Sequence, residues 1–197
     1  MNKKNDNILH ELIDLLKSAL ISIIVVIVLT NFVFKPIEVY GPSSLPTIRE
    51  GQIGLSSIIT LQFRTVRRFE FVIFPHLDET GQIRKDSQGK SIFLVKRVIG
   101  LPNETIEFRN DRLYVNGEFV DEPFLDNPLA KEYKDRGLLF TQNFGPITLG
   151  EDELFVVGDN RRGSSDSRGD LGPIKVSDVE SVGLFILFPF EDFGVVK

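Results

Sequence analysis

The chain has 197 residues, of which 42% are apolar and 26% are charged, and its formal net charge is -5. This composition is typical of one or two globular domains, and the acidic balance argues against a general nucleic-acid-binding protein. Because cysteine is absent, disulfides, thiolate nucleophiles and Cys-ligated zinc are excluded, and two histidines, His10 and His76, leave little room for a His-based metal site or a Ser-His-Asp triad. We therefore expect no metal, no cofactor and no nucleic-acid partner.

An uncharged apolar run covers residues 18–34 and is bracketed by Lys17 and Lys35. As a helix it would be about 25 Å long, near the short end of what crosses a bilayer. The many β-branched residues and the lack of a polar face argue against a buried soluble helix. The segment after the run lacks the small-x-small pattern of a cleaved secretory signal. We predict a membrane anchor over residues 18–35, after a short cytoplasmic segment of residues 1–17.

The charges around the anchor give a weak orientation signal. Three lysines precede it, whereas one lysine and one arginine follow it closely: Lys3, Lys4 and Lys17 against Lys35 and Arg49. This bias favours a cytoplasmic N-terminus and an extracytoplasmic domain over residues 36–197. The expectation is a single-pass protein of the cell membrane.

The hydrophobic pattern changes after Pro36 to short runs with a period near two, which indicates strands. The predicted strands are 37–40, 52–59, 71–74, 92–99, 105–108, 113–115, 118–120, 153–157 and 182–188. Asn116-Gly117 predicts a tight hairpin between two of these runs, and Asn110-Asp111 a second turn upstream. The fold class is therefore mainly β, an antiparallel β-sheet domain behind an N-terminal transmembrane helix.

Two polar stretches interrupt the strand pattern. Residues 80–90 read as a loop, and residues 121–150 as an insertion on the β core that could include one helical turn. Seventeen phenylalanines are many for this length. Most will be core residues, but four near the C-terminus could face lipid: Phe185, Phe188, Phe190 and Phe193.

Three segments carry residues suited to chemistry. The first, residues 39–47, holds Ser43 in an irregular backbone, where the serine can present its hydroxyl and a free N–H. In the second, residues 93–100, Lys96 shares one strand face with apolar residues, and burial would lower its pKa until the neutral amine could act as a general base. A packed stem with a solvent-exposed ammonium is the ordinary alternative.

The third segment, residues 157–169, is a dense polar loop after an apolar strand. It offers two Asp/Arg pairs, Asp159 with Arg161 and Asp166 with Arg168, together with three serines. It is either an exposed loop satisfied by its own side chains or a hydrogen-bonded buttress behind a catalytic pair. The arginines within it oppose a calcium site.

In this order, the three segments resemble the boxes of the bacterial type I signal peptidases. Residues 41–47 match the serine box G-x-S-M-x-P-T except at the methionine. Residues 96–102 reproduce the first seven positions of the lysine box K-R-V-I-G-L-P-G-D, and residues 158–168 fit the C-terminal box G-D-N-R-x-x-S-x-D-S-R. The resemblance covers nearly the whole chain.

The resemblance implies a membrane-anchored serine endopeptidase that removes signal peptides from preproteins through a Ser-Lys dyad. It makes Ser43 the nucleophile, Lys96 the general base and Ser164 the serine that orients the lysine. It places Asp159, Arg161, Asp166 and Arg168 at structural positions. The family's second oxyanion donor falls on Gly41, which has no side chain, so stabilisation would rest more on backbone donors such as the N–H of Ser43.

Three departures from the family pattern are visible. Ser44 replaces the methionine near the substrate pocket, Phe69-Glu70 replaces Gly-Asp, and Asn103-Glu104 replaces Gly-Asp after the lysine box. None removes a dyad residue, so the first departure bears on substrate fit rather than on the reaction. The resemblance further implies a substrate that binds as an extended strand, with small residues at the first and third positions before the cut.

Two other functions remain open from the sequence. One is a catalytically weak relative that serves as an assembly or binding factor at the membrane. The other is a self-cleaving repressor with the same dyad, but residues 1–35 form a membrane segment rather than a DNA-binding domain. The expected partners are preprotein signal peptides and the lipid bilayer, with the protein itself a monomer.

Overall fold

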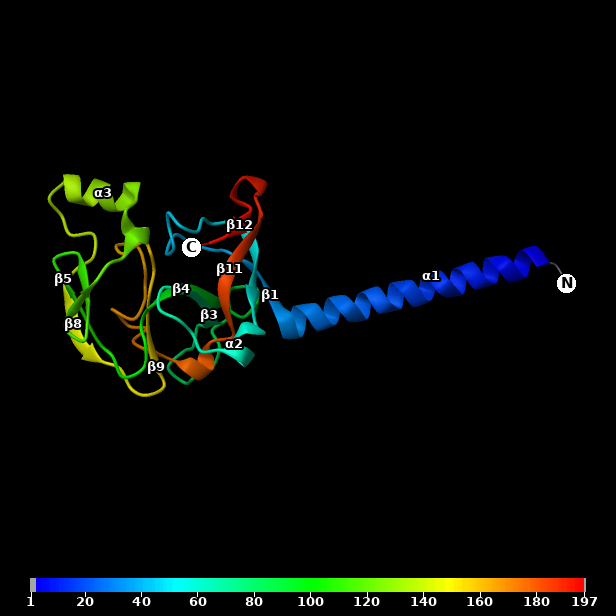
Figure 1. The fold of residues 1–197 in the computed structure, drawn as a ribbon, viewed down its shortest axis with the longest axis horizontal. Helices are drawn as coiled ribbons and strands as arrows, with labels where there is room; N and C mark the ends of the chain where they lie inside the picture. The colour runs from blue at the N-terminus through cyan, green and yellow to red at the C-terminus, as the bar shows by residue number, and fades with distance from the viewer. Residues whose placement is uncertain (1–2, 197) are drawn as a thin grey trace.

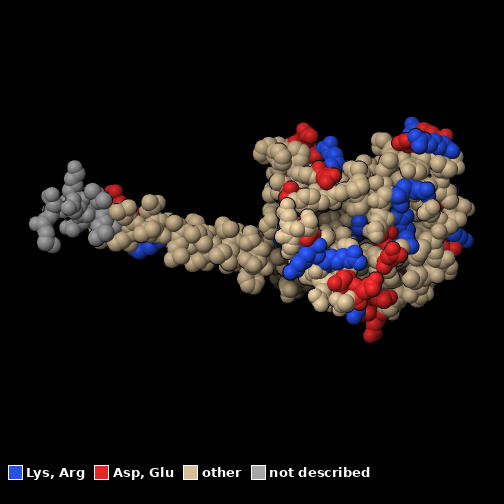
Figure 2. Space-filling view, turned by 180° about the vertical axis from the view of Figure 1, so that it is seen from behind, with Lys and Arg blue, Asp and Glu red and all other residues tan. Residues whose placement is uncertain are grey.

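The computed structural model describes residues 3–196, and the predicted N-terminal segment therefore has two residues, 1 and 2, outside the described part. One long helix, α1 (Lys3–Val28), continues as a π-helical turn, η1 (Leu29–Val33), and projects away from a β-rich body (Figure 1). Residues 10–33 are long and apolar enough to cross a membrane, and none of this stretch is buried against the body. Figure 2 shows it as an almost uncharged stalk.

The helix differs from the predicted anchor at both ends. It begins at Lys3 instead of residue 18, because charged residues mark the limit of an apolar run and not the limit of a helix. At the other end, Lys35 lies in strand β1 (Phe34–Glu38), so the helix stops two residues before the predicted limit. The chain passes from helix into sheet with no loop between them.

A large antiparallel sheet forms the centre of the body. Its order is β1-β2-β11-β3-β4-β9-β10, with β12 paired to β11. The strands after β1 are β2 (Ile53–Ser57), β3 (Phe71–Pro75), β4 (Phe93–Gly100), β9 (Glu153–Val157), β10 (Ile174–Lys175), β11 (Ser181–Phe188) and β12 (Gly194–Val195). A four-residue helix, α2 (Thr60–Phe63), follows β2. The predicted mainly-β class is confirmed.

A second sheet, in the order β7-β6-β5-β8, packs beside the first. Its strands are β5 (Thr105–Arg109), β6 (Arg112–Val115), β7 (Glu118–Val120) and β8 (Phe144–Thr148). Both predicted turns lie here, since Asn110, Asp111 and Asn116 have positive φ angles and Gly117 has a φ of 83°. Positive φ at both central residues is what a type I′ hairpin requires, which explains the Asn-Gly and Asn-Asp pairs.

The stretch 121–150 is only partly an insertion. It contains a short 3-10 helix at Pro123–Leu125 and the two-turn helix α3 (Pro128–Asp135), whose first turn is capped by the side chain of Asn127. Its last part is strand β8, which pairs with β5 and so belongs to the second sheet. The expected single helical turn is thus an underestimate, and β8 was missed because Gly145-Pro146 breaks the strand pattern.

Three apolar clusters hold these layers together and position the segments that carry the candidate site residues. One joins β3, β4 and β9 on a single face of the large sheet and contains Val72, Phe74, Val98 and Val156. A second lies between the two sheets. A third contains Val39 and Ile48, which stand on either side of the Ser43 segment.

Candidate active site

The Ser43 segment is an irregular loop whose two ends are fixed. Val39 and Ile48 are buried at its ends, and Val39 exchanges backbone hydrogen bonds with Gln52 and Gly51, each at 2.9 Å. Within the loop, the N–H of Ile48 donates to the carbonyl of Ser44 at 2.9 Å. Ser43 itself remains partly exposed between these anchors, as a nucleophile that must reach a substrate requires.

Gly41 has a backbone reason to be glycine. Its φ is +79°, a left-handed conformation that side-chain-bearing residues rarely adopt, and the space around the missing side chain is open. The turn that presents Ser43 therefore excludes the serine that would supply a second hydroxyl donor. Within residues 3–196, the N–H of Ser43 donates to no acceptor, so it is available to a ligand.

Lys96 lies in β4 opposite Val72 of β3 and is 2% exposed. Within the described residues it makes no hydrogen bond and no ion pair, although the carboxylate of Asp166 acts on it from a distance. Burial lowers the pKa of Lys96 to about 8, with a smaller raising effect from Asp166 and a lowering effect from Arg168. The stem-packed, solvent-exposed alternative is ruled out by this burial.

His76 is another titratable group near Lys96. It lies just beyond β3, and its backbone N–H donates to the backbone carbonyl of Ile92 at 2.9 Å. Burial lowers the pKa of His76, and the positive charges of Arg84 and Lys96 lower it further. A neutral His76 adds no charge beside the lysine near neutral pH.

Ser44 connects the two segments that carry Ser43 and Lys96. It is 3% exposed, and its hydroxyl donates to the carbonyl of Val95 at 3.3 Å. Because Ser44 and Val95 are the immediate neighbours of Ser43 and Lys96, this bond brings the backbones of the two dyad candidates together. A methionine at position 44 could not make this bond.

Ser164 meets Ser43 at Gly158. A Cβ atom at Gly158 would lie 2.3 Å from both the Ser164 hydroxyl oxygen and the Ser43 carbonyl oxygen. Both oxygens therefore lie against the backbone of Gly158. The Ser164 hydroxyl is buried and, within residues 3–196, has no hydrogen-bond partner of ordinary geometry. It lies near enough to the Asp166 carboxylate to act on its pKa.

The predicted pair of Asp166 with Arg168 is present. The Arg168 guanidinium donates to both carboxylate oxygens of Asp166, at 2.9 and 2.8 Å, and the N–H of Gly158 donates to the same carboxylate at 3.1 Å. Burial alone would raise the pKa of Asp166, but Arg168 holds the pKa below its usual range. Asp166 is therefore an anion next to the lysine segment.

The predicted pair of Asp159 with Arg161 is wrong. Asp159 is fully buried and accepts two hydrogen bonds from Arg97, at 2.8 and 2.7 Å, and one from the Thr47 hydroxyl at 2.6 Å. One carboxylate thus joins the Ser43 segment, the Lys96 strand and the third loop. Arg161 points elsewhere and pairs with Glu122, with nitrogen–oxygen distances of 2.5 and 3.2 Å.

Sequence reasoning missed three residues of this framework: Thr47, Arg97 and Glu122. Arg97 directly follows Lys96, and the alternation of a strand places it on the opposite face, so a charged residue there needed a buried acid. Thr47 could have been found as a hydroxyl within the serine box. Nothing local singles out Glu122 among the acids of residues 121–150.

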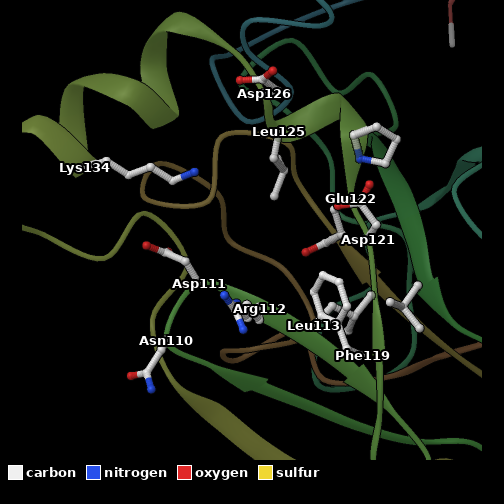
Figure 3. A pocket seen from close by; sticks show the side chains of 12 residues that line it. Asn110, Asp111, Arg112, Leu113, Phe119, Asp121, Glu122, Leu125, Asp126 and Lys134 are labelled. Carbon is white, nitrogen blue, oxygen red and sulfur yellow. The ribbon is translucent and has the colours of Figure 1, made fainter.

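One cavity lies away from this site. It has a volume of about 600 Å³ and is formed by the β5–β6 turn, the β6–β7 hairpin and residues 121–126, with Lys134 of α3 at its edge (Figure 3). Glu122 lines it and points from there toward Arg161. A smaller cavity of about 250 Å³ is lined by Ser164, Asp166 and Arg168.

Comparison with known proteins matches the sequence of this chain to one family. The model of the family described as "Signal peptidase, peptidase S26" matches residues 12–188. Signal peptidase I of Bacillus amyloliquefaciens is 32% identical over 185 residues, 94% of this chain and 92% of that protein. Signal peptidase I S of Bacillus subtilis (strain 168) is 30% identical over 192 residues, 98% of this chain and 97% of that protein.

A solved structure is also similar in sequence. A crystal structure of a signal peptidase I from Enterococcus faecalis V583 is 34% identical to the aligned part, which covers 60% of this chain and 97% of that chain, with a TM-score of 0.47.

Proposed function

The chain belongs to the signal peptidase family, peptidase S26, and on that premise we propose that it acts through Ser43 as nucleophile and Lys96 as general base. As a signal peptidase I homologue it is a serine endopeptidase that removes signal peptides. The pairing of a serine with a lysine is the general mechanism of the family. What is proposed for this chain is the assignment of each role to a residue.

The chemistry begins when the neutral amine of Lys96 removes the proton from the Ser43 hydroxyl. The Ser43 oxygen attacks the carbonyl carbon of the scissile peptide bond, and the resulting oxyanion accepts a hydrogen bond from the N–H of Ser43. The lysine then returns the proton to the leaving amine, which leaves an acyl-enzyme. Water hydrolyses this ester with the same lysine as base.

The burial of Lys96 is the observation that carries this proposal. A buried lysine without an ion pair is costly unless it is neutral, and its lowered pKa makes the amine available near physiological pH. Ser164 is proposed to orient the amine, since its buried hydroxyl has no partner of ordinary geometry among residues 3–196. Asp159, Arg161, Asp166 and Arg168 are proposed to hold the surrounding segments.

The substrate is proposed to bind as an extended strand beside the segments that flank Ser43 and Lys96. Ser44 is proposed to line the pocket for the residue before the cut. A serine there leaves either extra volume or a new polar contact in place of the family's methionine, and the bond to Val95 is such a polar contact. Small residues at the first and third positions before the cut are the expected preference.

The competing proposal is a catalytically weak assembly factor, which the exchange of methionine for Ser44 would motivate. The bond between Ser44 and Val95 weighs against it, since it joins the neighbours of both dyad residues. The test is incubation of the detergent-solubilised protein with a preprotein that carries a signal peptide. Cleavage that is lost in both Ser43→Ala and Lys96→Ala supports the dyad, whereas cleavage that survives either change contradicts it.

We further propose that α1 anchors the protein in a bilayer, with the N-terminus in the cytoplasm and the catalytic domain outside. Exposed aromatic side chains support a second contact with lipid, because α2 and the turn after β11 lie on the side of the body from which α1 leaves (Figure 1). The exposed fractions there are 82% for Phe63, 80% for Phe190 and 59% for Phe193. Phe185, by contrast, is partly covered and packs edge-on against Phe193.

Two experiments address this placement. Since the chain contains no tryptophan, Phe190→Trp creates a single fluorescent reporter. Its emission should shift to the blue with vesicles and be quenched by brominated lipid, and an unchanged spectrum would contradict lipid contact. Protease added to intact spheroplasts should digest the domain after Lys35, and digestion only after lysis would reverse the orientation.

A further inference from the structure

Asn160, in the third loop, holds the backbone on both sides of Ser43. Its side-chain NH2 donates to the carbonyl of Pro42 at 3.1 Å, and its backbone N–H donates to the carbonyl of Ser43 at 3.1 Å. Its side-chain oxygen accepts from the N–H of Gly163, also at 3.1 Å. The last bond fixes the orientation of the Asn160 side-chain amide. A flipped amide would place its NH2 against the N–H of Gly163 and its oxygen against the carbonyl oxygen of Pro42, and neither pair can form a hydrogen bond.

The bond to Pro42 acts on Ser43 through the geometry of the peptide group. The carbonyl of Pro42 and the N–H of Ser43 belong to one planar trans unit and point in opposite directions. A partner that fixes the carbonyl therefore also fixes the direction of the N–H. Within residues 3–196, this N–H has no acceptor of its own, so nothing at the nitrogen end determines where it points.

The peptide plane is held by two donors at its oxygen. The second is the N–H of Leu45, which reaches the same Pro42 carbonyl at 3.2 Å from within the loop. A hydrogen bond at the carbonyl also polarises the amide and strengthens its N–H as a donor. Asn160 is the donor that connects this plane to the body of the protein, since Leu45 moves with the loop.

We propose that Asn160 is a positioning residue that aims the N–H of Ser43 at the oxyanion of the transition state. The proposal rests on the proposed function and adds to it a residue that does not touch the reacting atoms. It has particular weight in this chain because Gly41 supplies no hydroxyl, which leaves the backbone donor to stabilise the oxyanion. Loss of the side-chain bond should therefore affect the transition state more than the bound substrate.

The experiment compares Asn160→Ala and Asn160→Asp with the wild type. The aspartate variant keeps the volume, the backbone bond to Ser43 and an acceptor for Gly163, but it replaces the donor to Pro42 with a negatively charged acceptor oxygen, and the neutral alanine variant controls for that charge. We expect kcat to fall about 10- to 100-fold in both variants, with KM within about twofold. The acid limb of the pH profile of Asn160→Ala should stay at the position set by Lys96, because the base is untouched.

Two inhibitors separate positioning from a merely structural role. A peptide aldehyde forms a hemiacetal with Ser43 whose oxygen occupies the oxyanion position, whereas a reduced-amide peptide has no carbonyl at that position. Affinity for the aldehyde should fall in parallel with kcat, while affinity for the reduced-amide peptide and the thermal midpoint should stay near the wild-type values. Asn127→Ala is the matched control, since the side chain of Asn127 also donates to one backbone carbonyl, that of Phe124, and accepts from one backbone N–H, that of Ala130, at the start of α3.

Each result decides the proposal. If Asn160→Asp and Asn160→Ala keep wild-type kcat, or if affinity for both inhibitors falls equally, Asn160 does not orient the oxyanion donor. If Asn160→Ala fails to fold, the aspartate variant still tests the proposal through the ratio of its affinity for the aldehyde to its affinity for the reduced-amide peptide. Cleavage by the wild type that is independent of Ser43 would refute the proposed function, and the Ser43→Ala control in the same assay reveals that separately.

Discussion

At the scale of single residues, the site depends on a lysine kept largely out of water. Lys96 occupies a buried strand position among apolar residues, where an apolar side chain would be more stable than a lysine. Within the described residues, no carboxylate is in contact with its amine. The lowered pKa reduces the free energy of unfolding where the amine is protonated, and it makes the neutral amine available as a base for proton transfer. Both consequences can be measured.

The first prediction concerns activity and pH. If neutral Lys96 is the base, kcat/KM should rise with pH and level off above the pKa of about 8. At pH 7 about a tenth of the enzyme would carry the neutral amine. The measurement is kcat/KM on a signal-peptide substrate from pH 6 to pH 9.5, with chemistry rate-limiting. A flat profile across that range would contradict the assignment.

The second prediction concerns the stability cost of the lysine. The pKa of Lys96 in the folded state lies below its ordinary value of 10.5, so the protonated amine disfavours folding, and this cost is fully present below pH 8. The cost declines between pH 8 and 10.5 and vanishes above. Lys96→Met should therefore be inactive and about 3 kcal/mol more stable at pH 7, with a gain that shrinks toward pH 10.

Denaturant unfolding of both proteins at several pH values measures this effect. Lys134→Met, in the exposed last turn of α3, is the matched control and should change stability little at any pH. A Lys96→Met protein that is no more stable than the wild type at pH 7 would show that the amine is better solvated than its burial indicates.

The third prediction concerns Ser44. Ser44→Met loses the bond to Val95 and fills the pocket, so cleavage should persist while the preference shifts between small and slightly larger residues before the cut. The measurement is kcat/KM on peptides varied at the first and third positions before the scissile bond. If the wild type cleaves none of the peptides and Ser44→Met switches cleavage on, the protein is better described as an assembly factor than as a protease.

At the scale of elements, buried ion pairs join segments that are far apart in sequence. Asp159 gathers three segments around one carboxylate, and Glu122 attaches the stretch after β7 to the third loop through Arg161. Such pairs stabilise little in total, but removal of one partner leaves a buried charge without compensation. We propose that they hold the loops that carry Ser43 and Ser164 in one arrangement.

The fourth prediction follows from the Glu122–Arg161 pair. Arg161 is 3% exposed, so Glu122→Ala should lower the free energy of unfolding by about 3–5 kcal/mol. The matched control is Glu132→Ala, which breaks an exposed pair with Arg136 and should cost less than about 0.5 kcal/mol. Equal effects of the two changes in urea unfolding would show that the buried pair has no structural role.

The strands and turns were predictable from sequence wherever alternation or turn residues act locally. The hairpin at Asn116-Gly117 and strands such as Glu153–Val157 follow from such signals. The short strands β10 and β12 carry too few residues to show a period. The partners of Asp159 were not predictable, because nearness in sequence to Arg161 says little about which buried cation the folded chain brings to a carboxylate.

At the scale of the whole molecule, α1 and the body are built separately. The helix side chains are exposed along residues 10–29, whereas the body has its own sheets and cores. Lys35 attaches the first strand to the body through an ion pair with Glu180 and lies over the ring of Phe93, at 3.5 Å from its centre. The body is therefore expected to fold without the helix.

The fifth prediction is that a chain starting at Phe34 folds and still binds vesicles. Its near-ultraviolet circular dichroism and thermal midpoint should match those of the full chain in detergent, since α1 contributes no packed surface to the body. Cosedimentation with vesicles should persist and be lost when Phe63, Phe190 and Phe193 are replaced by serine. A truncated chain that is unfolded would show that the helix stabilises the sheet.

The direct passage from η1 into β1 limits how far Ser43 can lie from the end of the helix. No flexible linker separates the span from the sheet, because Val33 ends the helix, accepts backbone hydrogen bonds from Ile58 and Ile59, and is followed at once by a paired strand. Ser43 lies nine residues beyond Phe34, which limits its height above the end of the span to about 30 Å. On the proposed placement of α1 in a bilayer, a scissile bond held farther from the membrane surface than this height is out of reach of Ser43, whatever its sequence.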